Sequence, residues 1–277
     1  MPINLKMNMI KNYYILLLFL LLFSCSKYQK VLKSNDFNLK FEKAVLYYQD
    51  LEFNKALPLF NELQTIMIGT SKIEDVSYYL ANCHYSTGDY LTAAYLFKRF
   101  TQNYPYSKYT EECSFMSAYC YYLESPNYSL DPTNNYKAIK ELQQHINQYP
   151  NSDKILECNT LIDELREKLS KKDFENAKQY FKTENYKSAI IALQNFLIDF
   201  PTYENREEVH YLIVRSSYLL AINSISTKIK ERLELTVDTY NQFSNNYPES
   251  KYLKMLEETF NKTNESLKKI KNNTNEI

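Results

Sequence analysis

Few side chains in this sequence have the types and spacings that catalysis or metal binding would need. The three histidines, His84, His145 and His210, lie inside helical patterns, and the first two occupy aromatic or apolar positions of those patterns. There is no glycine-rich phosphate loop, no nucleophile elbow and no Cys/His spacing of a metal site. We therefore predict a protein that is not an enzyme and has no catalytic residue, cofactor or metal.

The surroundings of Cys25 do indicate covalent chemistry. Lys6 and Lys11 precede an apolar run over residues 13–23, about half of the roughly 20 residues that a membrane-spanning helix needs. This pattern predicts a secretory signal peptide over residues 1–24. The stretch that ends in Cys25 resembles a bacterial lipobox, in which cleavage falls before the cysteine and the cysteine carries acyl chains. We predict lipidation of Cys25; the alternative is a signal peptide followed by an incidental cysteine.

The other four cysteines have no spacing that indicates a metal site or a disulfide framework. Cys113 and Cys120 would lie about 10.5 Å apart along one helix, which is too far for a disulfide. We predict that Cys83, Cys113, Cys120 and Cys158 are small buried apolar residues.

Pairs of aromatic residues seven positions apart recur along the chain and are the candidates for binding chemistry. Seven residues make two helical turns, so both rings of a pair share one helix face. Aromatic rings offer contact area at low entropic cost, which suits an extended apolar peptide. The five pairs are Phe41 and Tyr48, Tyr78 and Tyr85, Phe115 and Tyr122, Phe174 and Phe181, and Tyr211 and Tyr218.

The elements that must position these rings are predicted from a recurring apolar stripe. In residues 90–105, apolar residues lie at offsets of 3, 7, 10 and 14 from Tyr90, and Pro105 follows at 15. These offsets trace one face of an α-helix that the proline ends. Similar stripes occupy residues 135–150, 186–201 and 233–248, and a first copy over residues 53–68 lacks the proline. The chain has only two glycines, which argues against a sheet of tight hairpins.

A second set of predicted helices precedes these stripes. They share a small residue, for example Ala81, and an aromatic or histidine three positions later. A small residue, an aromatic, a second alanine, another aromatic and a proline form the pattern of tetratricopeptide repeats. We predict an all-α tetratricopeptide-repeat superhelix of about five helix pairs, roughly over residues 37–68, 74–106, 111–150, 170–202 and 207–249. Repeats three and five carry insertions between their helices, which indicate either loops on a binding face or sequence drift.

In tetratricopeptide arrays the first helices of the pairs line a groove, so the aromatic pairs of repeats one to three are the candidate peptide-binding residues. The alternative is that these rings pack against the neighbouring repeat. On the binding hypothesis, alanine at Tyr78, Tyr85 and Phe115 should weaken peptide capture and leave thermal stability nearly unchanged. The candidate groove residues are Phe41, Tyr48, Tyr78, Tyr85, Phe115 and Tyr122.

The predicted organisation has six parts. A signal peptide (1–24) and a tether (25–36) precede the N-terminal repeats one to three (37–150). A bridging helix (151–169) leads to the C-terminal repeats four and five (170–262), and a polar tail (263–277) follows. Basic and acidic residues balance at 33 each, and no basic stripe stands out, so we predict no binding to nucleic acid.

The anchor, the repeats and the motifs Tyr-Pro-Tyr-Ser-Lys-Tyr (104–109), Tyr-Pro-Asn-Ser-Asp-Lys (149–154) and Tyr-Pro-Glu-Ser-Lys-Tyr (247–252) resemble the BamD family. The resemblance implies a non-enzymatic, lipid-anchored scaffold on the periplasmic face of the outer membrane. It implies that repeats four and five (170–249) dock the periplasmic domains of the barrel insertase BamA. It also implies that repeats one to three receive unfolded outer-membrane barrel proteins, through their aromatic-ended C-terminal signal.

Two other functions stay open from the sequence. One is a periplasmic tetratricopeptide adaptor in cell-envelope constriction, although lipidation argues against it. The other is a glycan-binding lipoprotein of nutrient uptake, although such proteins use tryptophan as a sugar platform and this chain has none.

Overall fold

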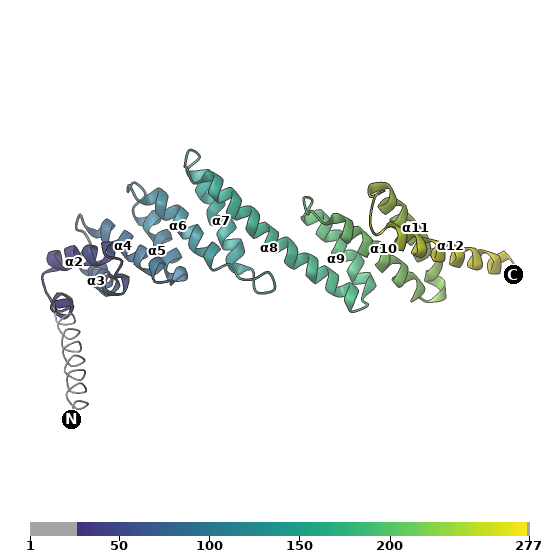
Figure 1. The fold of residues 1–277 in the computed structure, drawn as a ribbon, viewed down its shortest axis with the longest axis horizontal. Coiled ribbons are helices and arrows are strands. Elements are labelled where there is room, and N and C mark those ends of the chain that lie inside the picture. The colour runs from purple at the N-terminus through teal and green to yellow at the C-terminus, as the bar shows by residue number, and fades with distance from the viewer. Residues whose placement is uncertain (1–26, 276–277) are drawn as a thin grey trace, which may run out of the picture. The chain divides into compact units, whose positions relative to one another are not determined.

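The computed structural model describes residues 27–275, and every regular element within that range is an α-helix (Figure 1). The predicted signal peptide (1–24) and Cys25 lie outside the described residues. None of the helices in the described range is long and apolar enough to cross a lipid bilayer. The helices are α2 Phe37–Gln49, α3 Phe53–Ile66, α4 Ile73–Ser86, α5 Tyr90–Asn103, α6 Thr110–Leu123, α7 Thr133–Gln148, α8 Ile155–Lys182, α9 Tyr186–Asp199, α10 Arg206–Ile222, α11 Ser226–Asn246 and α12 Leu253–Asn275.

Helices that follow one another in the chain pack as hairpins. The pairs are α2 with α3, α4 with α5, α6 with α7, the second part of α8 with α9, and α10 with α11. The predicted all-α tetratricopeptide-repeat fold of about five helix pairs is confirmed. α8 is a single helix of 28 residues that includes residues 155–169 of the predicted bridging helix and the first helix of the fourth pair. Residues 151–154 of the predicted bridging helix belong instead to the turn before α8.

The chain divides into two compact units. Within the described range, the first comprises residues 27–126 and 131–165, and the second comprises residues 127–130 and 166–275. The first unit holds three hairpins, and its core residues include the fully buried Ala44, Ala81 and Ala118. These alanines lie where the sequence predicted a small residue, and their lack of bulk lets the paired helices approach closely.

The Tyr-Pro-x-Ser motifs form the connectors that follow the second, third and fifth hairpins. The backbone N–H of Ser107 donates to the carbonyl of Tyr104 over 3.1 Å, and the Ser107 hydroxyl accepts from the N–H of Tyr109. The corresponding serines, Ser152 and Ser250, accept from backbone N–H groups over 3.2 and 3.0 Å. Each serine therefore orders the turn that leads into the next helix, while the proline ends the previous one.

Three hairpin turns have a residue with a left-handed backbone conformation at the same position. Gly88 has φ +82°, and Leu51 and Glu184 take its place in the first and fourth hairpins with φ of 60° and 61°. Each of these residues donates its N–H to the carbonyl three positions earlier, over 3.0 to 3.1 Å. Only glycine adopts this conformation without strain between its Cβ position and the backbone.

We expect Glu184→Gly to raise the free energy of unfolding by about 1 kcal/mol, because it relieves a left-handed non-glycine residue. Urea unfolding followed by circular dichroism should show a higher midpoint with an unchanged slope. Glu184→Ala is the matched control, since it removes the same carboxylate and keeps the strained backbone. An equal rise for both variants would attribute the gain to charge instead.

Residues 27–32, inside the predicted tether (25–36), are helical. Tyr28, Val31 and Leu32 pack against the core of the first hairpin. These three residues form a single apolar face at helical spacing, and the first hairpin supplies the surface that covers it. The described part of the segment is therefore attached to the first hairpin over this helix and is not a free linker.

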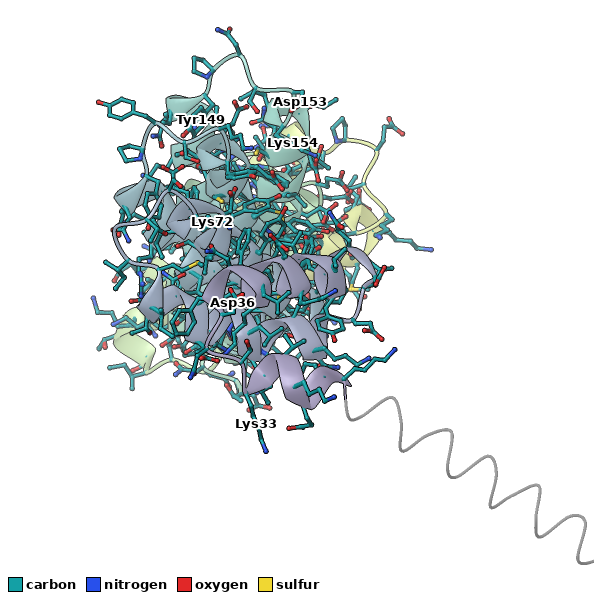
Figure 2. The ribbon with its side chains drawn as sticks, turned by 90° about the vertical axis from the view of Figure 1, so that its left-hand side faces the viewer. Lys33, Asp36, Lys72, Tyr149, Asp153 and Lys154 are labelled. Carbon is teal, nitrogen blue, oxygen red and sulfur yellow. The ribbon has the colours of Figure 1, made fainter. Side chains whose placement is uncertain are left out.

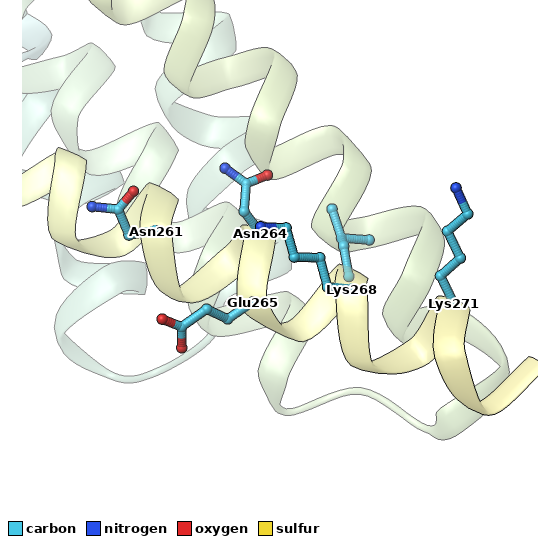
Figure 3. Close-up of a pocket in the computed structure, with 6 residues that line it drawn as sticks. Asn261, Asn264, Glu265, Lys268 and Lys271 are labelled. Atoms are coloured by element: carbon cyan, nitrogen blue, oxygen red, sulfur yellow. The ribbon is translucent and has the colours of Figure 1, made fainter.

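The C-terminal helix α12 also differs from the sequence prediction, which placed a polar tail over residues 263–277. Leu256 and Thr263 are fully buried against the last hairpin, and Phe260 stacks on Tyr240 at 4.3 Å. The shallow depression in Figure 3 is lined by six residues, all from α12, among them Asn261, Asn264, Glu265, Lys268 and Lys271. A polar outer face of this kind closes a repeat array, because it needs no further helix to cover it.

The two insertions take different forms. In the third hairpin, residues 124–132 form a loop between α6 and α7. Its tip is tied to α8, because Lys172 donates to the carbonyl of Leu130 over 2.8 Å and the Lys171 ammonium lies 4.6 Å from the Tyr128 ring. In the fifth hairpin the extra residues instead lengthen α10 and α11, and only residues 223–225 separate the two helices.

Candidate peptide-binding surface

The first ring of each aromatic pair, here called the upstream ring, is covered by a residue of the connector that follows its hairpin. Tyr109 stacks on Tyr78 with ring centroids 4.0 Å apart, and Tyr252 stacks on Tyr211 at 4.3 Å. The connector of the fourth hairpin places Tyr203 at 5.6 Å from Phe174. The upstream rings are Phe41, Tyr78, Phe115, Phe174 and Tyr211.

Lysines take the same role in the first and third hairpins. The Lys72 ammonium lies 4.9 Å from the centroid of the Phe41 ring, and the Lys154 ammonium lies 5.0 Å from that of Phe115. Both lysines are labelled in Figure 2. A cation over a ring face is attracted by the negative potential of that face, so each lysine holds its connector on the helix below.

Phe115 belongs to the core of the first unit. Only 5% of its surface is exposed, and its ring packs against Tyr119 at 5.6 Å and His145 at 5.9 Å. A side chain buried to this extent offers little area to a peptide. The expectation that alanine at this position leaves stability nearly unchanged does not fit this burial.

The second ring of each pair, here called the downstream ring, stays half-buried in the three N-terminal hairpins. Tyr48 contacts Phe53 at 5.5 Å, and Tyr85 contacts Tyr119 at 6.5 Å. Burial is the main cause that raises the pKa of Tyr48 to about 12, and it also raises the pKa of Tyr85. Both phenols are therefore neutral hydroxyls that can donate hydrogen bonds. The downstream rings are Tyr48, Tyr85, Tyr122, Phe181 and Tyr218.

Tyr119 joins the rings of α4 and α6 into one row, and the sequence reasoning missed it. It stacks on Phe115 and lies 5.8 Å from Tyr122, with the rings nearly parallel. Its spacing of four from Phe115 and three from Tyr122 places it on the same helix face, a signal that the sequence did contain.

Carboxylates border this row of rings. Glu112 accepts a hydrogen bond from the Tyr78 hydroxyl over 2.8 Å, and Glu164 accepts one from the Tyr122 hydroxyl. The bond to Glu164, followed by burial, raises the pKa of Tyr122 to about 12. Tyr78 is thus engaged by Tyr109 and Glu112 together, which leaves Tyr48, Tyr85, Tyr119 and Tyr122 as the rings best placed to meet a ligand.

The four cysteines of the described range are free and buried, as predicted. Burial raises the pKa of the Cys83 and Cys120 thiols to about 12 and that of Cys158 to about 11, so these groups stay protonated. Across residues 27–275, no group of three His, Cys, Asp or Glu side chains is arranged to hold a metal ion.

The histidines are engaged within the scaffold. His145 is fully buried, its Nδ1 lies 3.2 Å from the Ser114 hydroxyl, and burial lowers its pKa. His84 Nδ1 lies 3.0 Å from an Asp89 carboxylate oxygen at the start of α5.

Comparison with known protein families places the chain in one of them. The model of a family described as "YfiO: Outer membrane lipoprotein" matches residues 34–191 and 173–275. The chain belongs to the YfiO family of outer membrane lipoproteins. This is the BamD family, so the resemblance seen in the sequence is confirmed.

Other comparisons add little to the YfiO assignment. A solved structure described as the TPR2AB-domain:pHSP90-complex of yeast Sti1 shares 14% identity at a TM-score of 0.38, covering 82% of this chain and 98% of that chain. This likeness is too low to bear on function. Curated protein sequences give no significant match to the chain.

Proposed function

We propose that this chain is a non-enzymatic scaffold of the barrel assembly machinery, anchored through acylated Cys25 on the periplasmic face of the outer membrane. Membership in an outer membrane lipoprotein family supports the location. The half-buried row of Tyr85, Tyr119 and Tyr122, together with the half-buried Tyr48 of the first hairpin, is the observation that carries the proposed activity, because these rings give the first unit a surface for unfolded polypeptide.

The N-terminal hairpins receive unfolded outer-membrane barrel proteins in this proposal. Barrel strands present alternating apolar and aromatic side chains, which aromatic surfaces bind without a fixed sequence. The neutral hydroxyls of Tyr48 and Tyr85 supply donors for the carbonyl groups of an extended chain. The connectors that cover Phe41, Tyr78 and Phe115 confine such contacts to the downstream rings.

The C-terminal hairpins dock the periplasmic domains of BamA in this proposal. Ile191 and Ile198 are 50% and 74% exposed, and their spacing of seven places them on one face of α9. Exposed apolar side chains gathered on one face are typical of protein interaction sites. We therefore place part of the BamA contact on this face of α9.

Affinity purification of the tagged protein from detergent-solubilised outer membranes tests the proposal. We expect a barrel insertase with periplasmic domains to co-purify, and Ile191→Asp with Ile198→Asp to lose it, because two buried carboxylates would oppose docking. Leu91→Asp with Tyr95→Asp is the matched control, since it changes two exposed apolar residues on α5. Recovery of a sugar transporter or of enzymes of cell-wall synthesis in place of the insertase would contradict the proposal.

A further inference from the structure

The segment over residues 27–33 has one face that is fastened to the first hairpin. The Tyr28 hydroxyl donates to the carbonyl of Lys55 over 3.2 Å, and the Tyr28 ring lies 5.7 Å from that of Tyr47. The buried Lys40 ammonium donates to the carbonyl of Leu32 over 3.1 Å. These contacts fix which way the opposite face of the segment points.

That opposite face is basic. Lys27, Lys30 and Lys33 are exposed, and their spacing of three confines them to about 120° of the helix circumference. The N–H of Lys33 still donates to the carbonyl of Gln29 over 3.1 Å, so the helical geometry extends to this residue. Figure 2 shows Lys33 pointing away from the hairpin. In the described part of the chain, none of the three lysines forms an ion pair.

Two acids of the first hairpin, Asp36 and Glu62, are bound by other groups. Asp36 caps α2, where its carboxylate accepts from the N–H of Leu39 over 3.0 Å. Glu62 accepts from the Lys40 ammonium over 2.7 and 2.8 Å. Neither of these two acids pairs with Lys27, Lys30 or Lys33.

The basic face begins two residues after Cys25. Two residues of extended chain span at most about 7 Å, which is shorter than the roughly 8 Å over which physiological salt screens charges. We propose that Lys27, Lys30 and Lys33 bind the anionic headgroups of the phospholipid surface in which Cys25 is anchored. This inference rests on the proposed acylation of Cys25. Since the segment is fastened to α2 and α3, the headgroup contact sets the orientation of the first hairpin on the membrane.

Partitioning of a singly acylated protein into vesicles tests the inference. Cys83, Cys113, Cys120 and Cys158 are buried, so a maleimide that bears one myristoyl-length chain can be coupled to Cys25 in residues 25–277 produced without the signal peptide, in which Cys25 is not acylated. One such chain gives only marginal, reversible binding, which makes an added contribution from the lysines measurable. Vesicles of phosphatidylcholine alone are compared with vesicles that also contain phosphatidylglycerol.

We expect phosphatidylglycerol to strengthen partitioning by about fivefold for each contributing lysine, and high salt to remove the gain. Lys27→Gln, Lys30→Gln and Lys33→Gln together should abolish this gain and leave binding to phosphatidylcholine unchanged. The control triple Lys268→Gln, Lys269→Gln and Lys271→Gln removes three exposed lysines from α12 and should keep it. A gain that survives the first triple, or an absence of any gain in the parent, overturns the inference.

The anchor itself is tested separately. Mass spectrometry of the protein from its own membranes reports whether Cys25 carries acyl chains, whereas the coupled chain in the vesicle assay does not depend on natural acylation. A bare thiol at Cys25 would overturn the proposed anchor without altering the lysine measurement.

Discussion

Phe115→Ala is expected to lower the free energy of unfolding of the first unit by about 3–5 kcal/mol, the usual range for removing a buried phenylalanine. The ring lies in the core that joins α6, α7 and the first part of α8. Its loss would remove contacts with Tyr119 and His145 and the ring face below the Lys154 ammonium. The remaining cavity would also cost dispersion energy that these neighbours cannot recover by small shifts.

Urea unfolding of the mature chain, followed by circular dichroism, measures this loss. Phe115→Leu should cost less, because leucine fills most of the same volume. Tyr106→Ala is the neutral control, since Tyr106 is 99% exposed and its loss should change stability by no more than about 0.5 kcal/mol. If Phe115→Ala lowered the free energy of unfolding as little as Tyr106→Ala does, the position of Phe115 in the core would be contradicted.

Tyr48→Ala with Tyr85→Ala is expected to weaken binding of an aromatic-ended peptide by at least on the order of a hundredfold. Each ring that anchors a peptide contributes about 2 kcal/mol, or roughly thirtyfold in affinity. Both rings are half-buried, so each retains area for a ligand while its position is fixed by neighbours such as Phe53 and Tyr119. Fluorescence anisotropy of a labelled peptide of alternating apolar residues that ends in phenylalanine measures the change.

The control for this prediction is Phe181→Ala with Tyr218→Ala, which removes the downstream rings of the fourth and fifth hairpins. This variant should lose comparable stability and keep the peptide affinity. If both double variants bound the labelled peptide as tightly as the parent does, the downstream rings would serve packing and not peptide binding. Melting curves of each variant identify a loss of affinity that follows from unfolding.

Much of the fold could be predicted from the sequence because its determinants are local. The apolar stripe of residues 90–105 and the proline that ends it act within one helix, and α5 covers that stretch. The buried alanines and cysteines follow from the same periodicity. The ends of the array were harder to predict. Residues 27–32 have an apolar face of only three residues, and residues 263–275 are mostly polar, so neither stretch shows a full helical stripe. The first stretch packs against the first hairpin, and Thr263 of the second is buried.

The apolar periodicity also could not predict which polar residues are buried in the core. Lys40 is 1% exposed, and its ammonium is held by the Glu62 carboxylate and the Leu32 carbonyl. Burial of a charge is tolerated only when partners are supplied. Those partners come from residues 8 and 22 positions away, so no short-range pattern could predict them.

The sequence by itself determined the helices of the five hairpins, their pairing and the five aromatic pairs, because helical periodicity and connector chemistry depend on residues within a few turns of one another. Only the tertiary structure decided which ring of each pair remains available. Tyr109 covers Tyr78 and Lys154 covers Phe115 from connectors that lie 31 and 39 positions further along the chain. Side chains so distant in sequence meet only when one hairpin packs against the next, and that packing separates the core rings from those of the candidate surface.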